Sequence, residues 1–233
     1  MYSLPQKLVA EFIGTFTLIF IGAGSICADQ YIQSAGKPGI GLLAIAAAHG
    51  LAIAIMVSAV GHISGGHLNP AVTIGFWVSR RLGTFQTLAY WAAQLAGAAF
   101  AAFLLSVIIP IETWSRVYLG APDLANDFTR MHGMALEAVT SFLLVFVVFA
   151  TAADNKGAFS KIAGFAIGLT VCMDILIAGP FTGAAMNPAR AFGPALVAHH
   201  WNNHGVYWVG PLVGGVIAGA LYNALYLRDQ PPA

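Results

Sequence analysis

The chain has 233 residues, of which 58% are hydrophobic and only 8% are charged. Soluble globular domains carry about 25% charged residues, so this sequence cannot cover its surface with charge and is suited to lipid. The net charge of +1 gives no sign of the basic footprint that binds nucleic acid, and no nucleic-acid partner is expected.

Six apolar segments, taken in chain order, are long enough for the roughly 20 residues that a spanning helix needs. They cover about residues 8–28, 40–61, 82–109, 132–153, 161–180 and 206–227. Lys7 precedes the first segment as in a signal peptide, but the apolar run is too long for an ordinary signal and is read as uncleaved. The sequence therefore predicts an all-α protein that crosses a bilayer six times.

A polar loop over about residues 110–131 divides the chain into two similar halves within one domain, 1–233. Repeat 1 covers about 8–109 and repeat 2 about 132–227, and SGGHLNPA at 64–71 reappears as TGAAMNPA at 182–189. Each half has three spans, an odd number, so the second half must be inverted relative to the first. Inverted repeats of this kind are common in membrane transport proteins.

A short apolar run follows each repeated motif, over 69–79 and 187–199, and is too short to cross a bilayer. Asn is a strong N-cap and Pro is favoured at the first helical position, so each Asn-Pro-Ala predicts the start of a half-helix. Backbone outside helices survives at membrane depth only where it is buried or lines a wet cavity. The two half-helices are expected to meet near the midplane and line a pore, with the positive ends of their dipoles repelling cations. The motif residues are Asn69, Pro70, Ala71, Asn187, Pro188 and Ala189.

The backbone before each motif is expected to stay extended and to present carbonyl oxygens that replace the hydration of a passing solute. These are the carbonyls of Gly65, Gly66, His67, Gly183, Ala184 and Ala185. Glu11 and Glu137 open the two halves. Each could belong to a proton relay, but we favour a structural role in which the carboxylate accepts hydrogen bonds from the backbone of the re-entrant loop in its own half.

Basic residues near the helix ends favour a cytoplasmic location for both termini. The inner side would then hold Lys7, Arg80, Arg81, Lys156, Lys161 and Arg228, and the outer side Lys37, Arg116 and Arg130.

With these motifs, the chain resembles the aquaporin (major intrinsic protein) superfamily over nearly its whole length. The runs MNPARAFGPA at 186–195 and YWVGP at 207–211 are similar to the tonoplast intrinsic subgroup. The resemblance implies six transmembrane helices and two re-entrant half-helices in a right-handed bundle. It also implies a homotetramer with one pore per subunit, and passive conduction of water without protons or ions. No cofactor, metal or enzymatic activity is expected.

Family members narrow at four positions counted from the two Asn residues, which here are His49, Ile175, Ala184 and Arg190. The His-Ile-Ala-Arg set matches the tonoplast pattern, and it suggests ammonia, urea or glycerol as secondary solutes beside water. Glycerol facilitators typically carry Asp where this chain has Ala191. The plasma (inner) membrane is favoured over a vacuolar-type membrane.

Two other functions are considered, a coupled secondary transporter and a junctional membrane protein. The midplane lacks a carboxylate cluster for a driving ion, with Asp174 the only loose candidate, and the outer loops are short. His199, His200 and His204 are read as polar residues at the end of a half-helix rather than as metal ligands.

Overall fold

The computed structural model describes residues 2–154, 156 and 162–228, and within them every regular element is helical. The long helices are α1 (Leu4–Ser34), α2 (Gly41–Ser64), α4 (Thr84–Ile108), α6 (Arg130–Val148), α7 (Ala163–Thr182) and α9 (Val206–Tyr226). The shorter elements are α3 (Pro70–Val78), α5 (Ile111–Trp114), α8 (Pro188–Ala198), a 3₁₀ turn η1 (Tyr118–Gly120) and a π-helical turn η2 (Phe149–Ala153).

The six predicted spans are confirmed as helices that are long and apolar enough to cross a membrane. The first is longer than predicted at both ends. Ser3 and Gln6 form a capping box that starts α1 at Leu4, and at the other end polar residues such as Asp29 and Gln33 extend the helix beyond its apolar part. Lys161, at the predicted start of the fifth span, lies outside the described residues.

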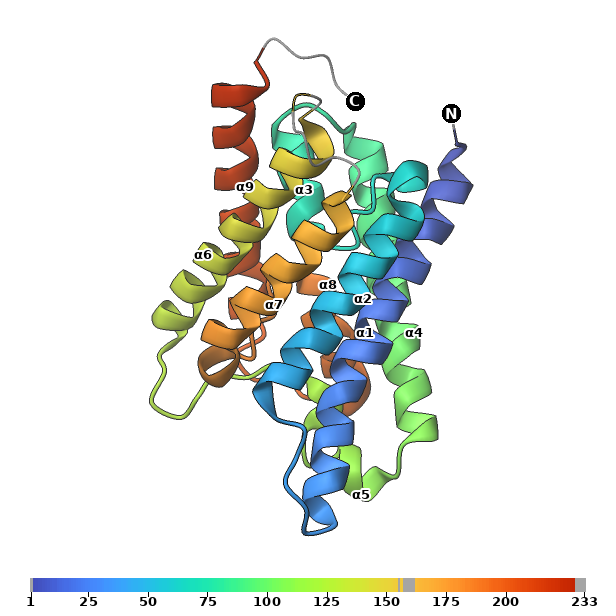
Figure 1. The fold of residues 1–233 in the computed structure, drawn as a ribbon, viewed down its shortest axis with the longest axis vertical. Helices are drawn as coiled ribbons and strands as arrows, with labels where there is room; N and C mark the ends of the chain where they lie inside the picture. Colours follow the sequence, from blue (N-terminus) through green and yellow to red (C-terminus); the bar gives the residue numbers. More distant parts are fainter. Residues whose placement is uncertain (1, 155, 157–161, 229–233) are drawn as a thin grey trace.

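The two half-helices, α3 and α8, lie inside the bundle formed by the long helices (Figure 1). The packing repeats itself between the halves: α1 packs on α2 and α4, as α6 packs on α7 and α9. Each half-helix packs mainly on a long helix of the other half: α3 on α9, and α8 on α4. α1 begins at the same end of the bundle at which α9 ends, and together with the matching contacts of the two halves this agrees with the expected inverted repeat.

Glycines allow the helices to approach closely at matching places in the two halves. Gly97 of α4 faces the carbonyl of Phe12 in α1, and Gly214 of α9 faces the carbonyl of Ala138 in α6. Between the halves, Gly50 of α2 and Gly168 of α7 each face the carbonyl oxygen of the other, so a Cβ at either position would collide with backbone. Small residues at helix interfaces serve this purpose in lipid, where packing rather than the hydrophobic effect drives association.

Candidate functional site

The N-termini of α3 and α8 meet in the middle of the bundle. Each Asn caps its own half-helix, since Asn69 accepts from the N–H of Ala71 at 2.7 Å and Asn187 from the N–H of Ala189 at 2.9 Å. Each Asn amide also donates across to the other half: Asn69 Nδ2 to the carbonyl of Met186 at 2.8 Å, and Asn187 Nδ2 to the carbonyl of Leu68 at 2.9 Å. These reciprocal bonds fix the two tips against each other and leave one N–H of each amide for another acceptor.

The backbone before each motif is not extended as predicted. Gly65, Gly66 and Leu68 have φ of 95°, 61° and 52°, and the corresponding Gly183, Ala184 and Met186 have 77°, 46° and 51°. An extended strand turns successive residues to opposite sides. Left-handed residues interrupt that alternation, which allows successive carbonyls to face one side. The cost falls on the non-glycine residues, because the left-handed region is unfavourable for residues with a Cβ.

Glu11 and Glu137 each accept hydrogen bonds from one of these two segments. Glu11 accepts from the hydroxyl of Ser64 and from the N–H groups of His67 and Leu68, at 2.6, 3.0 and 2.7 Å. Glu137 does the same in the second half.

The partners of Glu137 are the hydroxyl of Thr182 and the N–H groups of Ala185 and Met186, at 2.7, 2.9 and 2.7 Å. Both carboxylates are fully buried. Their bonds pair backbone N–H groups of the two re-entrant segments that would otherwise be buried without an acceptor.

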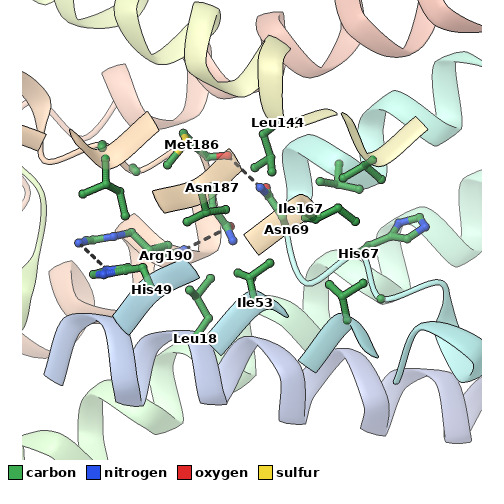
Figure 2. A pocket seen from close by; sticks show the side chains of 18 residues that line it. Leu18, His49, Ile53, His67, Asn69, Leu144, Ile167, Met186, Asn187 and Arg190 are labelled. Atoms are coloured by element: carbon green, nitrogen blue, oxygen red, sulfur yellow. Dashed lines mark hydrogen bonds between the residues drawn. The ribbon is translucent and has the colours of Figure 1, made fainter. Parts of the chain in front are cut away.

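One narrow cavity, with a volume of about 30 Å³, passes the meeting point of the half-helices. In Figure 2, Asn69 and Asn187 lie in its middle, with Arg190 and His49 at one end and His67 at the other. Apolar side chains from α1, α2, α6 and α7 form most of the wall: Leu18, Ile53, Val57, Leu144, Val148, Ile167, Val171 and Ile175. The wall is therefore mostly apolar, with the polar groups of Asn69, Asn187, Arg190 and the two histidines at a few points along it.

Of the predicted carbonyl-bearing residues, Gly66, His67, Ala184 and Ala185 line this cavity. Gly65 lies farther out, in a second cavity that also contains His67 and Lys7. Gly183 packs instead against Pro122 of the connecting loop.

The four residues predicted to form a constriction all line the cavity: His49, Ile175, Ala184 and Arg190. Arg190 donates from Nη1 to the carbonyl of Gly120 at 2.7 Å, and its Nη2 lies 3.4 Å from His49 Nε2. His49 Nδ1 lies 2.9 Å from the carbonyl of Ile45, so Nδ1 carries the hydrogen and Nε2 is left as the acceptor that faces Arg190. This arrangement places one fixed cation and one neutral ring at the same end of the cavity.

The opposite end contains a polar chain that the sequence analysis missed. Thr73 donates to the carbonyl of Asn69 at 2.9 Å, and its oxygen accepts from His67 Nδ1 at 3.2 Å and from Gln94 Nε2 at 3.0 Å. Gln94 also donates to Glu11 at 2.8 Å. The sequence offered one sign of this chain, the amide side chain of Gln94 within an otherwise apolar span. Its partners, Glu11 and Thr73, lie in other helices.

Two other groups of polar residues lie off the cavity wall. Asp174 is buried beside Ile175, near enough to Glu137 for an electrostatic interaction, and neither of its oxygens has a hydrogen-bond partner in the described part of the chain. His200 instead bonds Asp123 at 2.8 Å, and His204 accepts from the indole N–H of Trp208 at 3.0 Å. Burial lowers the pKa of His204 below its ordinary value.

Comparison with known proteins agrees with this geometry. Residues 2–222 match the family model described as "Major intrinsic protein". The chain is 44% identical to Aquaporin TIP4-4 of Zea mays, covering 96% of this chain and 88% of that protein. It is 43% identical to Probable aquaporin TIP3-2 of Arabidopsis thaliana, covering 97% of this chain and 86% of that protein.

Among solved structures, the aquaglyceroporin from Plasmodium falciparum superposes with a TM-score of 0.84 at 20% identity, covering 97% of this chain and 98% of that one. At that identity the match supports the fold alone. Together, the inverted repeat, the two half-helices joined at their Asn caps and the match over nearly the whole chain show that this protein belongs to the major intrinsic protein family, the aquaporins.

Proposed function

We propose that this protein is a passive water channel whose path is the cavity between His49 and His67, and that it excludes ions at the Asn69–Asn187 junction and at Arg190. The observation that carries the proposal is the pair of reciprocal bonds between the half-helix tips beside that cavity. Two positive helix ends point at one place in a low-dielectric surrounding, which opposes the passage of a cation.

The residues that set solute size in this proposal are His49, Ile175, Ala184 and Arg190. Ile175 and Ala184 form an apolar side, whereas Arg190 and His49 form a polar side on which the guanidinium is already bonded to Gly120. A wall of this kind favours small neutral solutes, so urea, ammonia and glycerol are candidates after water. The aquaporin names of the relatives support the water assignment.

We further propose a homotetramer in a cellular membrane with both termini in the cytoplasm. The family resemblance supports the tetramer. Lys7, Arg80, Arg81 and Arg228 line two cavities at one end of the bundle, as expected for a cytoplasmic face. The plasma (inner) membrane remains our preferred location, with a vacuolar-type membrane as the alternative that the names of the relatives favour. The division into repeats at about 8–109 and 132–227 also stays a prediction.

Stopped-flow osmotic shrinkage of proteoliposomes tests the function directly. The wild type should accelerate water flow over protein-free vesicles, with weak temperature dependence and no need for an ion gradient. A requirement for a driving ion would favour the secondary transporter instead.

The constriction is tested by the double variant His49→Phe, Ile175→His, which exchanges the polar and apolar positions and narrows the opening. We expect any urea or glycerol flux to fall while water flux remains. Ile177→Phe is the matched control, because Ile177 lies on the exposed face of the same helix. Equal solute flux in the double variant and the control would show that these positions do not select solutes.

A further inference from the structure

The loop segment over residues 118–123 reaches the outer end of the cavity in a strained conformation. Tyr118, Leu119 and Gly120 follow one another with φ of 48°, 56° and 73°, although only the third is a glycine. Leu119 and Gly120 are buried. Left-handed conformations at non-glycine residues persist only where the surroundings enforce them, and they cluster at functional sites.

The strained turn ends at the contact with Arg190. The carbonyl of Gly120 accepts from Arg190 Nη1 at 2.7 Å, and both groups are buried. On its other side Gly120 packs tightly against Ala23 in α1, where an added Cβ would lie only about 3.0 Å from the backbone. The carbonyl therefore belongs to a turn that is closely packed against α1.

A single side chain, His200, holds both ends of this segment. The ring of Tyr118 stacks on the imidazole with centroids 3.9 Å apart and planes 16° apart. At the other end, His200 Nε2 donates to Asp123 Oδ2 at 2.8 Å. We call Tyr118, Asp123 and His200 the outer clamp.

His200 is itself fixed to the helix that carries Arg190. Its N–H donates to the carbonyl of Ala195 in α8 at 3.0 Å, and its side chain is mostly buried at 7% exposure. Asn203 also binds the carboxylate of Asp123, donating from Nδ2 to Oδ1 at 3.0 Å. The side-chain oxygen of Asn203, Oδ1, accepts from Arg130 Nε at 2.9 Å. The clamp thus joins the connecting loop to α8 on the outer side of Arg190.

We propose that the outer clamp positions Arg190: His200 holds Tyr118 and Asp123, which keeps the carbonyl of Gly120 in place and the guanidinium against the wall of the channel. The proposal rests on the role given to Arg190 in the proposed function. Without the clamp the strained turn relaxes and Arg190 Nη1 loses the carbonyl of Gly120 as its acceptor. The guanidinium then moves into the lumen, where water can accept its hydrogen bonds. His200 and Asp123 are positioning residues, because neither lines the cavity.

The test compares His200→Ala and Asp123→Ala with the wild type, as water permeability per folded protein in proteoliposomes. We expect the water permeability of each variant to fall about five-fold, the lower end of the range for the energetic coupling of two sites in a protein. The permeability of each variant should also depend more steeply on temperature. The double variant should lose no more than either single one, because the two residues act through one contact.

Three further variants and one structure separate positioning from general damage. His200→Gln keeps an N–H for Asp123 and should recover part of the flux, and Asp123→Asn should also recover part. His199→Asn is the matched control, since His199 is the exposed neighbour and Asn tolerates its left-handed φ of 52°. A thermal unfolding scan in detergent checks that each variant is folded.

A cryo-EM structure of His200→Ala should show Arg190 away from the carbonyl of Gly120. Wild-type flux in both alanine variants, or an Arg190 still bonded to Gly120 in that structure, would overturn the proposal. A wild-type protein that conducts no water would instead overturn the proposed function, and the position of Arg190 in the variant would still test the clamp.

Discussion

The two halves of the molecule use the same frame and differ in what they place around it. In each half an acid holds the re-entrant segment, an Asn caps the half-helix, and a tyrosine hydroxyl supports the segment from the neighbouring long helix. Tyr90 donates to the carbonyl of Ser64 at 2.6 Å, and Tyr207 to that of Thr182 at 2.9 Å. The frame therefore follows the inverted repeat almost bond for bond.

The differences lie at matching positions. Thr73 and Gln94 on one side correspond to Ala191 and Pro211 on the other, and Arg190 corresponds to Val72. The half with α3 thus has a neutral polar chain ending at His67, whereas the half with α8 has a single cation held by the loop. The two halves therefore share the frame, and they differ at the positions to which the proposed selectivity is assigned.

The largest expected effect comes from removing a frame acid. Glu11→Ala strands a buried hydroxyl, an amide and two backbone N–H groups, each costing roughly 1–3 kcal/mol when left unpaired. Glu137→Ala leaves one group fewer without a partner, because no residue bonds Glu137 in the way that Gln94 bonds Glu11 in the described part of the chain. Thermal unfolding in detergent should show both variants strongly destabilised, Glu11→Ala more so. Equal stability of Glu11→Ala and wild type would contradict the role of the frame.

The second prediction makes the two halves alike at the constriction. Arg190→Val introduces the residue of the corresponding position, Val72, and removes the cation from the cavity wall. We expect urea flux to rise about ten-fold, equivalent to a barrier lower by about 1.4 kcal/mol. Stopped-flow swelling in urea measures it. Ile177→Phe, on the exposed face of α7, serves as the control and should leave urea flux unaltered.

A smaller effect is expected from the neutral polar chain. Gln94→Leu removes the donor to both Thr73 and Glu11 but leaves the remaining bonds of that carboxylate in place. Stability should fall by about 1–3 kcal/mol, with water flux per folded channel close to the wild type. A large loss of flux without a loss of stability would mean that Gln94 acts on the solute rather than on the frame.

The smallest expected effect is the response of water flux to the pH around Asp123 of the outer clamp. Burial alone would raise the pKa of Asp123, but hydrogen bonds from Asn203, the N–H of Leu124 and His200 outweigh it and leave the pKa below the ordinary 3.8. A lowered folded-state pKa stabilises the clamp at pH values above the ordinary pKa, and that stability is lost as the pH falls through the lowered value.

Water flux should therefore stay flat between about pH 5 and 8 and decline only in stronger acid. Proteoliposomes at stepped pH provide the measurement, with Asp123→Asn as the variant that should lose the acid response. A flux that changes steeply near pH 6 would point to a different group.

Much of the fold could be predicted because it depends on local patterns. Apolar length gave the six spans, and Asn-Pro-Ala gave the starts of α3 and α8. The left-handed residues before each motif were missed, because Leu68 and Met186 have no sequence signature for that conformation and adopt it only when the acids and tyrosines hold the segment. The partners of Gln94 and His200 were missed for the same reason: they are set by tertiary packing between distant segments.

The contact between Gly50 and Gly168 lies between α2 and α7, the second long helices of the two halves. Each of these helices presents the same surface to the other, which is the defining property of an isologous interface between identical subunits. A chain of half this length could associate with a second, oppositely inserted copy through that surface and bring the two Asn caps together. Because the two halves are joined in one chain, each can carry different residues at matching positions, which a symmetric pair of identical chains cannot do.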